Sequence, residues 1–145
     1  MSRRAVPPPS ASDPLAADAA RFTGDLIRTL GHAPRAPVLL AVSGGPDSMA
    51  MLALAAAALP GGIAAATVDH RLRPAAAVEA ESVAAHCAAI GVPHAVLAPD
   101  TPIAGPSLQA QARRARYALL AREARRIGAE GIATAHHVAT RPRPS

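Results

Sequence analysis

The chain has 145 residues, which suits a single domain, and half of them are hydrophobic, enough for a buried core. Its aromatic residues are one phenylalanine and one tyrosine, so base stacking on this segment would be weak. The formal charge of +5 suits an anionic partner. The longest apolar stretch, Met49 to Leu59, is too short to span a bilayer, and no apolar run follows MSRRAVPPPS as in a signal peptide. These features favour a cytoplasmic protein with no membrane partner.

Patterns of apolar residues predict the elements in chain order. Residues 1–12 are rich in proline and serine and are expected to be disordered. One apolar stripe predicts a first helix from Pro14 to Leu30, which Gly31 ends. Beyond it, short apolar runs predict buried strands and longer apolar patterns predict helices. The strands are expected at 37–42, 63–68, 94–98 and 131–135, and the helices at 47–59, 74–90 and 108–127, with Ser107 as the N-cap of the last.

Strands that alternate with helices predict a doubly wound α/β fold with a mostly parallel sheet and right-handed crossovers. Ligands of such folds bind outside the carboxyl ends of the strands. The segments that follow the four expected strands are polar: SGGPDS, DHRLRP, PDTP and HH. The sequence therefore predicts a ligand site at the edge of the sheet where these segments meet.

The first of these segments, SGGPDS, begins at Ser43 and has the composition of an anion-binding loop. Gly44 and Gly45 are expected to form the turn, because glycine adopts backbone angles that other residues avoid and lets N–H groups approach an anion closely. Pro46 precedes a helix whose N-terminus directs free N–H groups and its positive dipole end at the same point. The hydroxyl groups of Ser43 and Ser48 are expected to be further donors.

The loop has no lysine, and all 15 basic residues of the chain are arginine. Without a lysine, the backbone N–H groups and hydroxyl groups of the loop would have to hold a pyrophosphate group by themselves. A carboxylate beside bare phosphate is unfavourable, so Asp47 is interpreted as a ligand of a Mg²⁺ ion carried by the phosphates. The alternative is an ordinary strand-to-helix turn in which Asp47 only caps the helix.

The second segment places four charged or titratable side chains at the rim of the expected crevice: Asp69, His70, Arg71 and Arg73. Burying such groups for packing alone is costly, which favours a functional role. The alternative is that Asp69 caps the turn at the end of its strand.

Two arginines of the 108–127 helix are candidates for the site. At about 100° per residue, Arg116 falls within the apolar arc of the helix and Arg113 lies near its edge. An arginine on the apolar side needs an anionic partner, either a carboxylate such as Asp69 or a phosphate. Three other arginines of the helix lie on its far side and are expected to form a solvated face: Arg114, Arg122 and Arg125.

Two histidines, His136 and His137, follow the fourth expected strand. Neighbouring residues of a strand point to opposite faces, so at most one of them is expected to meet a nucleotide. A zinc site is not expected, because no cysteine lies nearby.

These segments carry a family resemblance. SGGPDS resembles the SGGxDS signature of the PP-loop ATP pyrophosphatases, which have the adenine nucleotide alpha hydrolase-like fold and cleave ATP between its α and β phosphates. VDHRLRP, QARRARY and TAHH resemble successive motifs of the tRNA(Ile)-lysidine synthetase family, in the same order over residues 38–137. The family pattern ARxxRY matches Ala112, Arg113, Arg116 and Tyr117.

The resemblance implies a site and a reaction. Its nucleotide-binding residues would be 43–48 and Asp69, and Asp47 would also hold Mg²⁺. Its catalytic residues would be Asp47, Arg113, Arg116 and His136. The enzyme would use ATP to adenylate the 2-carbonyl oxygen of a cytosine in the anticodon of an isoleucine tRNA. The ε-amine of free lysine would then attack that carbon and release AMP, with pyrophosphate as the other product. A homodimer is left open.

The sequence departs from the family pattern after the two histidines. The family continues into a pair of aspartates and Gln-Ala-Glu-Thr, which supplies a second carboxylate for Mg²⁺, whereas this chain reads VATRPRPS. The tail can be translated back into DNA with one of its permitted sets of codons. If a single A is inserted into that DNA, the segment after the histidines reads Val-Asp-Asp-Gln-Ala-Glu-Thr, which is the family motif. Residues 13–137 are therefore interpreted as the N-terminal part of the ATP-binding domain, which is incomplete, and 138–145 as a frameshifted tail. Such a chain, about a third of a typical member, is expected to be inactive alone.

Two other functions remain open. A PP-loop tRNA thiolase would bring paired cysteines, and the one cysteine here, Cys87, is expected to lie in the core of a protein from a reducing compartment. A non-catalytic nucleotide-binding module would bind ATP without releasing pyrophosphate.

Overall fold

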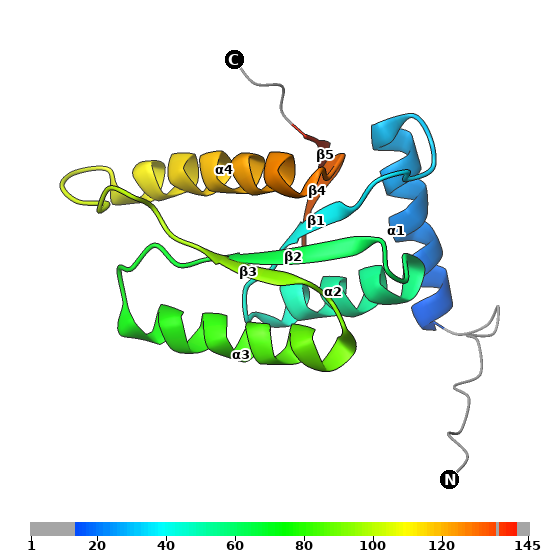
Figure 1. Cartoon of the computed structure of the whole chain (residues 1–145), viewed down its shortest axis with the longest axis horizontal. Coiled ribbons are helices and arrows are strands. Elements are labelled where there is room, and N and C mark those ends of the chain that lie inside the picture. The colour runs from blue at the N-terminus through cyan, green and yellow to red at the C-terminus, as the bar shows by residue number, and fades with distance from the viewer. Residues whose placement is uncertain (1–13, 136, 142–145) are drawn as a thin grey trace, which may run out of the picture.

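Figure 1 shows the computed structural model of the protein, which describes residues 14–135 and 137–141. The expected disordered leader, His136 and the last four residues of the expected tail lie outside these described residues. Helices alternate with strands in the order α1 (Pro14–Leu30), β1 (Val38–Ala41), α2 (Pro46–Ala58), β2 (Ile63–Val68), α3 (Pro74–Ile90), β3 (His94–Leu97), α4 (Leu108–Ile127), β4 (Gly131–Thr134) and β5 (His137–Thr140).

The strands form one sheet in the order β3-β2-β1-β4-β5. β1 lies in the middle and pairs in parallel with β2 and β4, so Val38 is level with both Ile63 and Gly131. β3 continues the parallel sheet beside β2. The expected parallel α/β sheet is therefore confirmed for four strands. β5 was not expected: it pairs antiparallel with β4, where Thr134 is level with His137.

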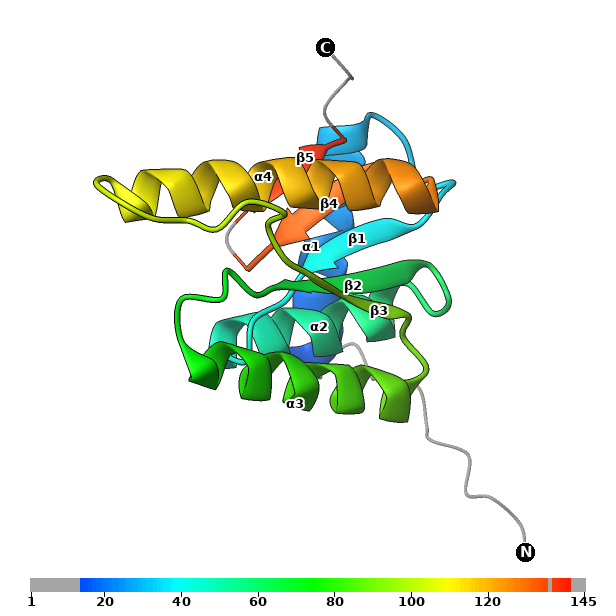
Figure 2. The ribbon, with the colours of Figure 1, turned by 60° about the vertical axis from the view of Figure 1, so that its left-hand side comes forward.

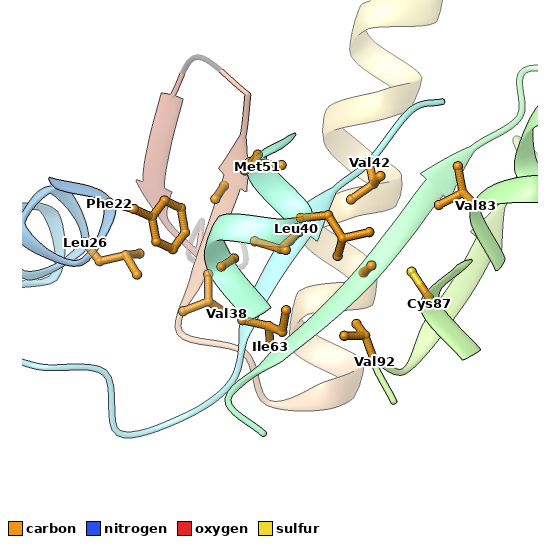
Figure 3. Close-up of a cluster of buried hydrophobic side chains, with 14 residues drawn as sticks. Phe22, Leu26, Val38, Leu40, Val42, Met51, Ile63, Val83, Cys87 and Val92 are labelled. Atoms are coloured by element: carbon orange, nitrogen blue, oxygen red, sulfur yellow. The ribbon is translucent and has the colours of Figure 1, made fainter. Parts of the chain in front are cut away.

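Helices cover both faces of the sheet, as Figures 1 and 2 show, with α4 on one side and α2 and α3 on the other. β1 is buried throughout, and its residues alternate between the two faces. Val38 and Leu40 join the larger core cluster, which α1, α2 and α3 complete (Figure 3). Leu39 joins the smaller cluster under α4. Cys87 is fully buried in the larger cluster, as expected.

The helix ends follow local rules, with one exception. Gly91 and Gly128 end α3 and α4 in the left-handed conformation, at φ 74° and 72°. Ser107 is the N-cap residue of α4, as expected, but its side chain does not cap the helix. Ser107 occupies the N-cap position at φ 63° and ψ 40° without a side-chain capping bond, because capping needs an extended backbone there. Within residues 14–135 and 137–141, no helix is long and apolar enough to cross a bilayer.

A carboxylate fastens the amino end of the sheet. Glu130, just before β4, accepts hydrogen bonds from the backbone N–H groups of Arg35 and Ala36, at 2.5 and 3.0 Å. These two residues lead into β1, so one side chain ties together the starts of two neighbouring strands. His32 Nε2 lies 3.6 Å from the other carboxylate oxygen. The hydrogen bonds from Ala36 and Arg35 and the nearby charges lower the pKa of Glu130, with the Ala36 bond as the largest cause.

Candidate nucleotide-binding site

A cavity of about 740 Å³ opens where β1 and β4 end, and its size is in the usual range for small-molecule sites. Four groups of residues line it: the end of β1 with the loop into α2, His70 after β2, the first half of α4, and the end of β4 at Thr134 and Ala135. These segments follow the carboxyl ends of parallel strands or face them, which is where ligands of α/β sheets bind. The structure therefore brings together two of the four polar segments that the sequence singled out, SGGPDS and the His70 part of DHRLRP, with the arginine-bearing half of α4.

The two serines of the loop hold its shape. Ser48 is buried, at 7% exposure, and its Oγ accepts a hydrogen bond of 2.8 Å from the backbone N–H of Ser43. Ser43 Oγ in turn accepts a bond of 3.3 Å from the N–H of Gly45. Both hydroxyl groups were expected to act as donors to an anion. Each acts here as an acceptor within the loop, and its own O–H hydrogen is left to donate toward the cavity that both residues line.

The two glycines of the loop have ordinary backbone angles. Gly45 has φ −71° and ψ 158°, an extended conformation open to any residue, and Gly44 is not among the glycines with positive φ. The expectation of special angles at this turn is therefore wrong. A Cβ atom at Gly44 would lie 2.6 Å from the Cγ atom of Glu79, an exposed side chain that would have to move to make room. The backbone at Gly44 is thus held against a side chain of α3.

The N-terminus of α2 supplies unpaired donors to the cavity. The first helical bond runs from the N–H of Met49 to the carbonyl of Gly45, at 3.0 Å. The N–H groups of Asp47 and Ser48 precede it and so have no partner within the helix. Pro46 occupies the first turn, where its missing N–H costs nothing. Asp47 and Ser48 line the cavity, and a helix N-terminus with free N–H groups favours anions.

Asp47 lines the cavity with an exposed side chain. In residues 14–135 and 137–141 no group of three or more His, Cys, Asp or Glu side chains is arranged to hold a metal. A Mg²⁺ ion typically uses one or two carboxylates together with substrate phosphates and water. Asp47 therefore fits a magnesium ion that arrives with a nucleotide, and does not by itself form a metal centre.

The two candidate arginines of α4 line the cavity opposite the loop. Arg116 is half-buried and Arg113 is exposed, whereas Arg114 is exposed and does not line it. The expected orientation of Arg116 is therefore confirmed. The ion pairs found among the described residues do not include Arg116. Arg116 lines the cavity without a direct ion pair to a carboxylate of the described residues, which suits an anionic ligand.

Asp69 does not line this cavity. Its Oδ1 accepts a hydrogen bond of 2.8 Å from the backbone N–H of Arg71, which has a positive φ of 59°. This is the turn-capping role that was weighed against a functional one. Its role in nucleotide binding stays a prediction.

His70, which the sequence had placed at the rim without a defined role, lies in the cavity wall. Its Nδ1 atom is buried and has no hydrogen-bond partner within the described part of the chain. Burial lowers the pKa of His70, the charge of Arg116 lowers it further, and Asp69 acts in the opposite direction. Burial and the charge of Arg116 thus disfavour the protonated form of His70, whose Nδ1 atom is unpaired among the described residues. The sequence feature that could have identified His70 as a site residue is its position directly after Asp69, at the end of the second strand.

Of the two histidines after β4, His136 lies outside the described residues, so its expected catalytic role stays a prediction. His137 begins β5 and is exposed. It lines a second cavity, of about 800 Å³, between α1, α2 and the β4–β5 pair. Asp47 and Thr134 line both cavities, so the two are adjacent.

The architecture and the site define a class of protein: a mostly parallel α/β domain with a ligand-sized cavity at the loop between its first strand and the helix that follows. Comparison with known protein families identifies the family within this class. The family model of the PP-loop domain matches residues 18–140, and the chain belongs to this ATP-binding family.

The curated relatives are tRNA(Ile)-lysidine synthases. The chain is 48% identical over 121 residues to the one from Methylobacterium nodulans, covering 82% of this chain and 35% of that protein. It is also 48% identical over 119 residues to the one from Zymomonas mobilis, covering 81% of this chain and 36% of that protein. The chain thus spans about a third of the length of these relatives.

Solved structures share the fold at low identity. The U34-tRNA thiolase NcsA from Methanococcus maripaludis superposes with a TM-score of 0.67 at 16% identity, covering 85% of this chain and 46% of that one. The NH3-dependent NAD synthetase from Campylobacter jejuni gives a TM-score of 0.59 at 18% identity, covering 81% and 53%.

Proposed function

We propose that this domain binds ATP with Mg²⁺ and serves the formation of lysidine in an isoleucine tRNA. The observation that carries the proposal is the cavity itself. It joins the SGGPDS loop to Arg113 and Arg116, two motifs that are far apart in the sequence and share one ligand space. The 48% identity to tRNA(Ile)-lysidine synthases over most of the chain supports the particular reaction.

The residues of the cavity suit the charges of the nucleotide. The first-turn N–H groups of α2 and the hydroxyl group of Ser43 donate to the phosphates. Asp47 would hold a magnesium ion, which would supply positive charge to the pyrophosphate leaving group. Arg113 and Arg116 lie on the opposite wall, where they stabilise the charge that develops when the bond between the α and β phosphates breaks.

The proposed reaction has two steps. The 2-carbonyl oxygen of cytosine attacks the α phosphate of ATP, which forms an adenylated cytosine and releases pyrophosphate. The ε-amine of lysine then attacks the same ring carbon, loses a proton, and displaces AMP. The part of the protein is to position the two substrates and to neutralise charge. Isoleucine tRNA and free lysine are the proposed partners, and the 145-residue chain alone is proposed to be inactive.

The proposal is tested best in a chimera. Residues 38–135 replace the matching segment of the Methylobacterium nodulans enzyme, and AMP is measured with lysine and isoleucine tRNA present or omitted. We expect AMP release that depends on both substrates. A chimera that is folded and binds ATP but releases no such AMP would contradict the lysidine reaction. The 145-residue chain in the same assay should bind ATP without forming lysidine.

A thiolase is less well supported. The cysteine of this chain, Cys87, is fully buried in the larger core cluster, and burial raises the pKa of its thiol. A protonated core thiol does not act as a nucleophile toward sulfur or a cluster ligand. A non-catalytic module would bind ATP in the chimera and release no pyrophosphate.

A further inference from the structure

The phosphate loop already holds an anion that belongs to the protein. Glu79, near the start of α3, accepts a hydrogen bond of 2.6 Å through its Oε1 atom from the backbone N–H of Gly44. Its Cγ and Oε1 atoms fill the space beside Gly44, at 2.6 and 2.8 Å from the position of a hypothetical Cβ atom. One of the glycine N–H groups that the loop would offer to a phosphate is therefore already hydrogen-bonded to a carboxylate of the protein.

We propose that Glu79 is an internal occupant of the phosphate loop that a nucleotide must displace, and that it lowers the affinity of the empty site for ATP. This inference rests on the proposed binding of ATP. A carboxylate and a phosphate oxygen are both anionic acceptors, so they compete for the same N–H donor. Displacement frees the Gly44 N–H for the nucleotide and moves a negative charge away from its phosphates.

The contact has the properties of a displaceable one. Glu79 is exposed, and the bond to Gly44 joins a long side chain to one backbone group. An exposed carboxylate loses little when water replaces one hydrogen bond, and it regains rotamer freedom on release. Leaving the loop therefore costs far less than removing a buried anchor.

Glu79 also acts on the site through its charge. Glu79 and Arg116 line one small cavity of about 60 Å³ beneath the loop. A carboxylate in that position offsets the positive field that Arg116 adds to the nucleotide site. Glu79 thus opposes a phosphate in two ways, by taking a donor and by reducing the attraction of the arginine.

Two variants separate these effects. Glu79→Gln removes the charge and keeps an oxygen acceptor, whereas Glu79→Ala removes both. Glu81→Gln is the matched control, because it makes the same charge change two residues along α3, on another side of the helix. Dissociation constants for α,β-methylene-ATP and for inorganic pyrophosphate are measured by calorimetry with Mg²⁺, and folding is checked by thermal melting.

We expect Glu79→Ala to bind both probes about tenfold more tightly than the wild type, since one charge-assisted hydrogen bond no longer competes. Glu79→Gln should fall between the two, and Glu81→Gln should stay within about twofold of the wild type because an exposed distant charge is screened. The amide signal of Gly44 in an NMR spectrum without ligand should move in Glu79→Ala and stay in place in Glu81→Gln.

Three outcomes would overturn the inference. Unchanged or weaker binding by both Glu79 variants would mean that the carboxylate only holds the loop. An equal gain in Glu81→Gln would mean that net charge alone is responsible. Absence of binding in the wild type and in all variants would refute the ATP site, and the proposed function would then fail together with this inference.

Discussion

Glu79 and Glu130 make the same kind of contact at opposite ends of the sheet. Each carboxylate accepts hydrogen bonds from backbone N–H groups of a distant segment. Glu130 binds two N–H groups, keeps only 19% of its side chain exposed, and lies at the amino ends of β1 and β4. Glu79 binds one N–H group, is exposed, and lies at the carboxyl end of β1.

The difference teaches how one interaction serves two purposes. Burial and a second hydrogen bond make Glu130 a permanent anchor, because no ligand or water can replace it cheaply. Exposure and a single hydrogen bond make Glu79 replaceable by a ligand of the same charge. The amino end of the sheet should therefore govern stability, and the carboxyl end should govern binding. The following predictions test this separation, from the largest expected effect to the smallest.

The largest effect is expected at the loop. Gly45→Val should weaken ATP binding by roughly 100-fold, because the isopropyl group would cost two charge-assisted hydrogen bonds to the phosphates. The fold should persist, since Gly45 has φ −71° and a Cβ atom there meets nothing closer than Ser43 Oγ at 3.5 Å. Calorimetry measures the affinity and circular dichroism the fold. Ala53→Val, on an exposed position of α2, is the control. Retained ATP affinity in Gly45→Val would place the phosphate site elsewhere.

At the amino end, Glu130→Ala should lower the free energy of unfolding by about 2 kcal/mol, because two backbone N–H groups lose a charged acceptor. The affinity for ATP should not change. Urea unfolding measures the stability and calorimetry the affinity, with Glu81→Gln as a surface control. If Glu130→Ala weakens ATP binding while the protein stays folded, the two ends of the sheet are coupled and the separation is wrong.

Arg116→Ala should weaken ATP binding by about tenfold, since one charge-assisted contact to a phosphate is lost. Arg114→Ala, two residues earlier on the exposed side of the same helix, should change the affinity by less than about twofold. Neither variant should alter the free energy of unfolding much. Equal losses in the two variants would show that α4 contributes only a diffuse positive charge.

The smallest effect concerns pH. The pKa of Glu130 is lowered in the folded protein, so between its folded and its ordinary value the unfolded chain binds more protons. Its contribution to stability is thus complete above the ordinary glutamate value and is lost as the pH falls through the folded one. Urea unfolding from pH 6 to pH 3 should show a steeper loss in the wild type than in Glu130→Gln. Parallel curves would contradict the anchor role.

Much of the fold was open to prediction from the sequence. The bounds of β2 and α3 follow from apolar runs punctuated by glycine and proline, and these are local signals. The half-buried position of Arg116 follows from helical periodicity alone. The loop was recognisable because its serines, glycines and aspartate sit directly after a buried strand.

The tertiary structure decided what local patterns do not encode. β5 exists because residues 137–140 find the open edge of β4, whereas their composition reads as a tail. The glycines of the loop proved to have ordinary backbone angles, and only Gly44 lies close to a neighbouring side chain, that of Glu79. Glu79 meets Gly44 across 35 positions, and Glu130 meets Arg35 across 95. Sequence periodicity fixes which face of an element is buried, but only the packing of the elements decides which distant N–H group a carboxylate reaches.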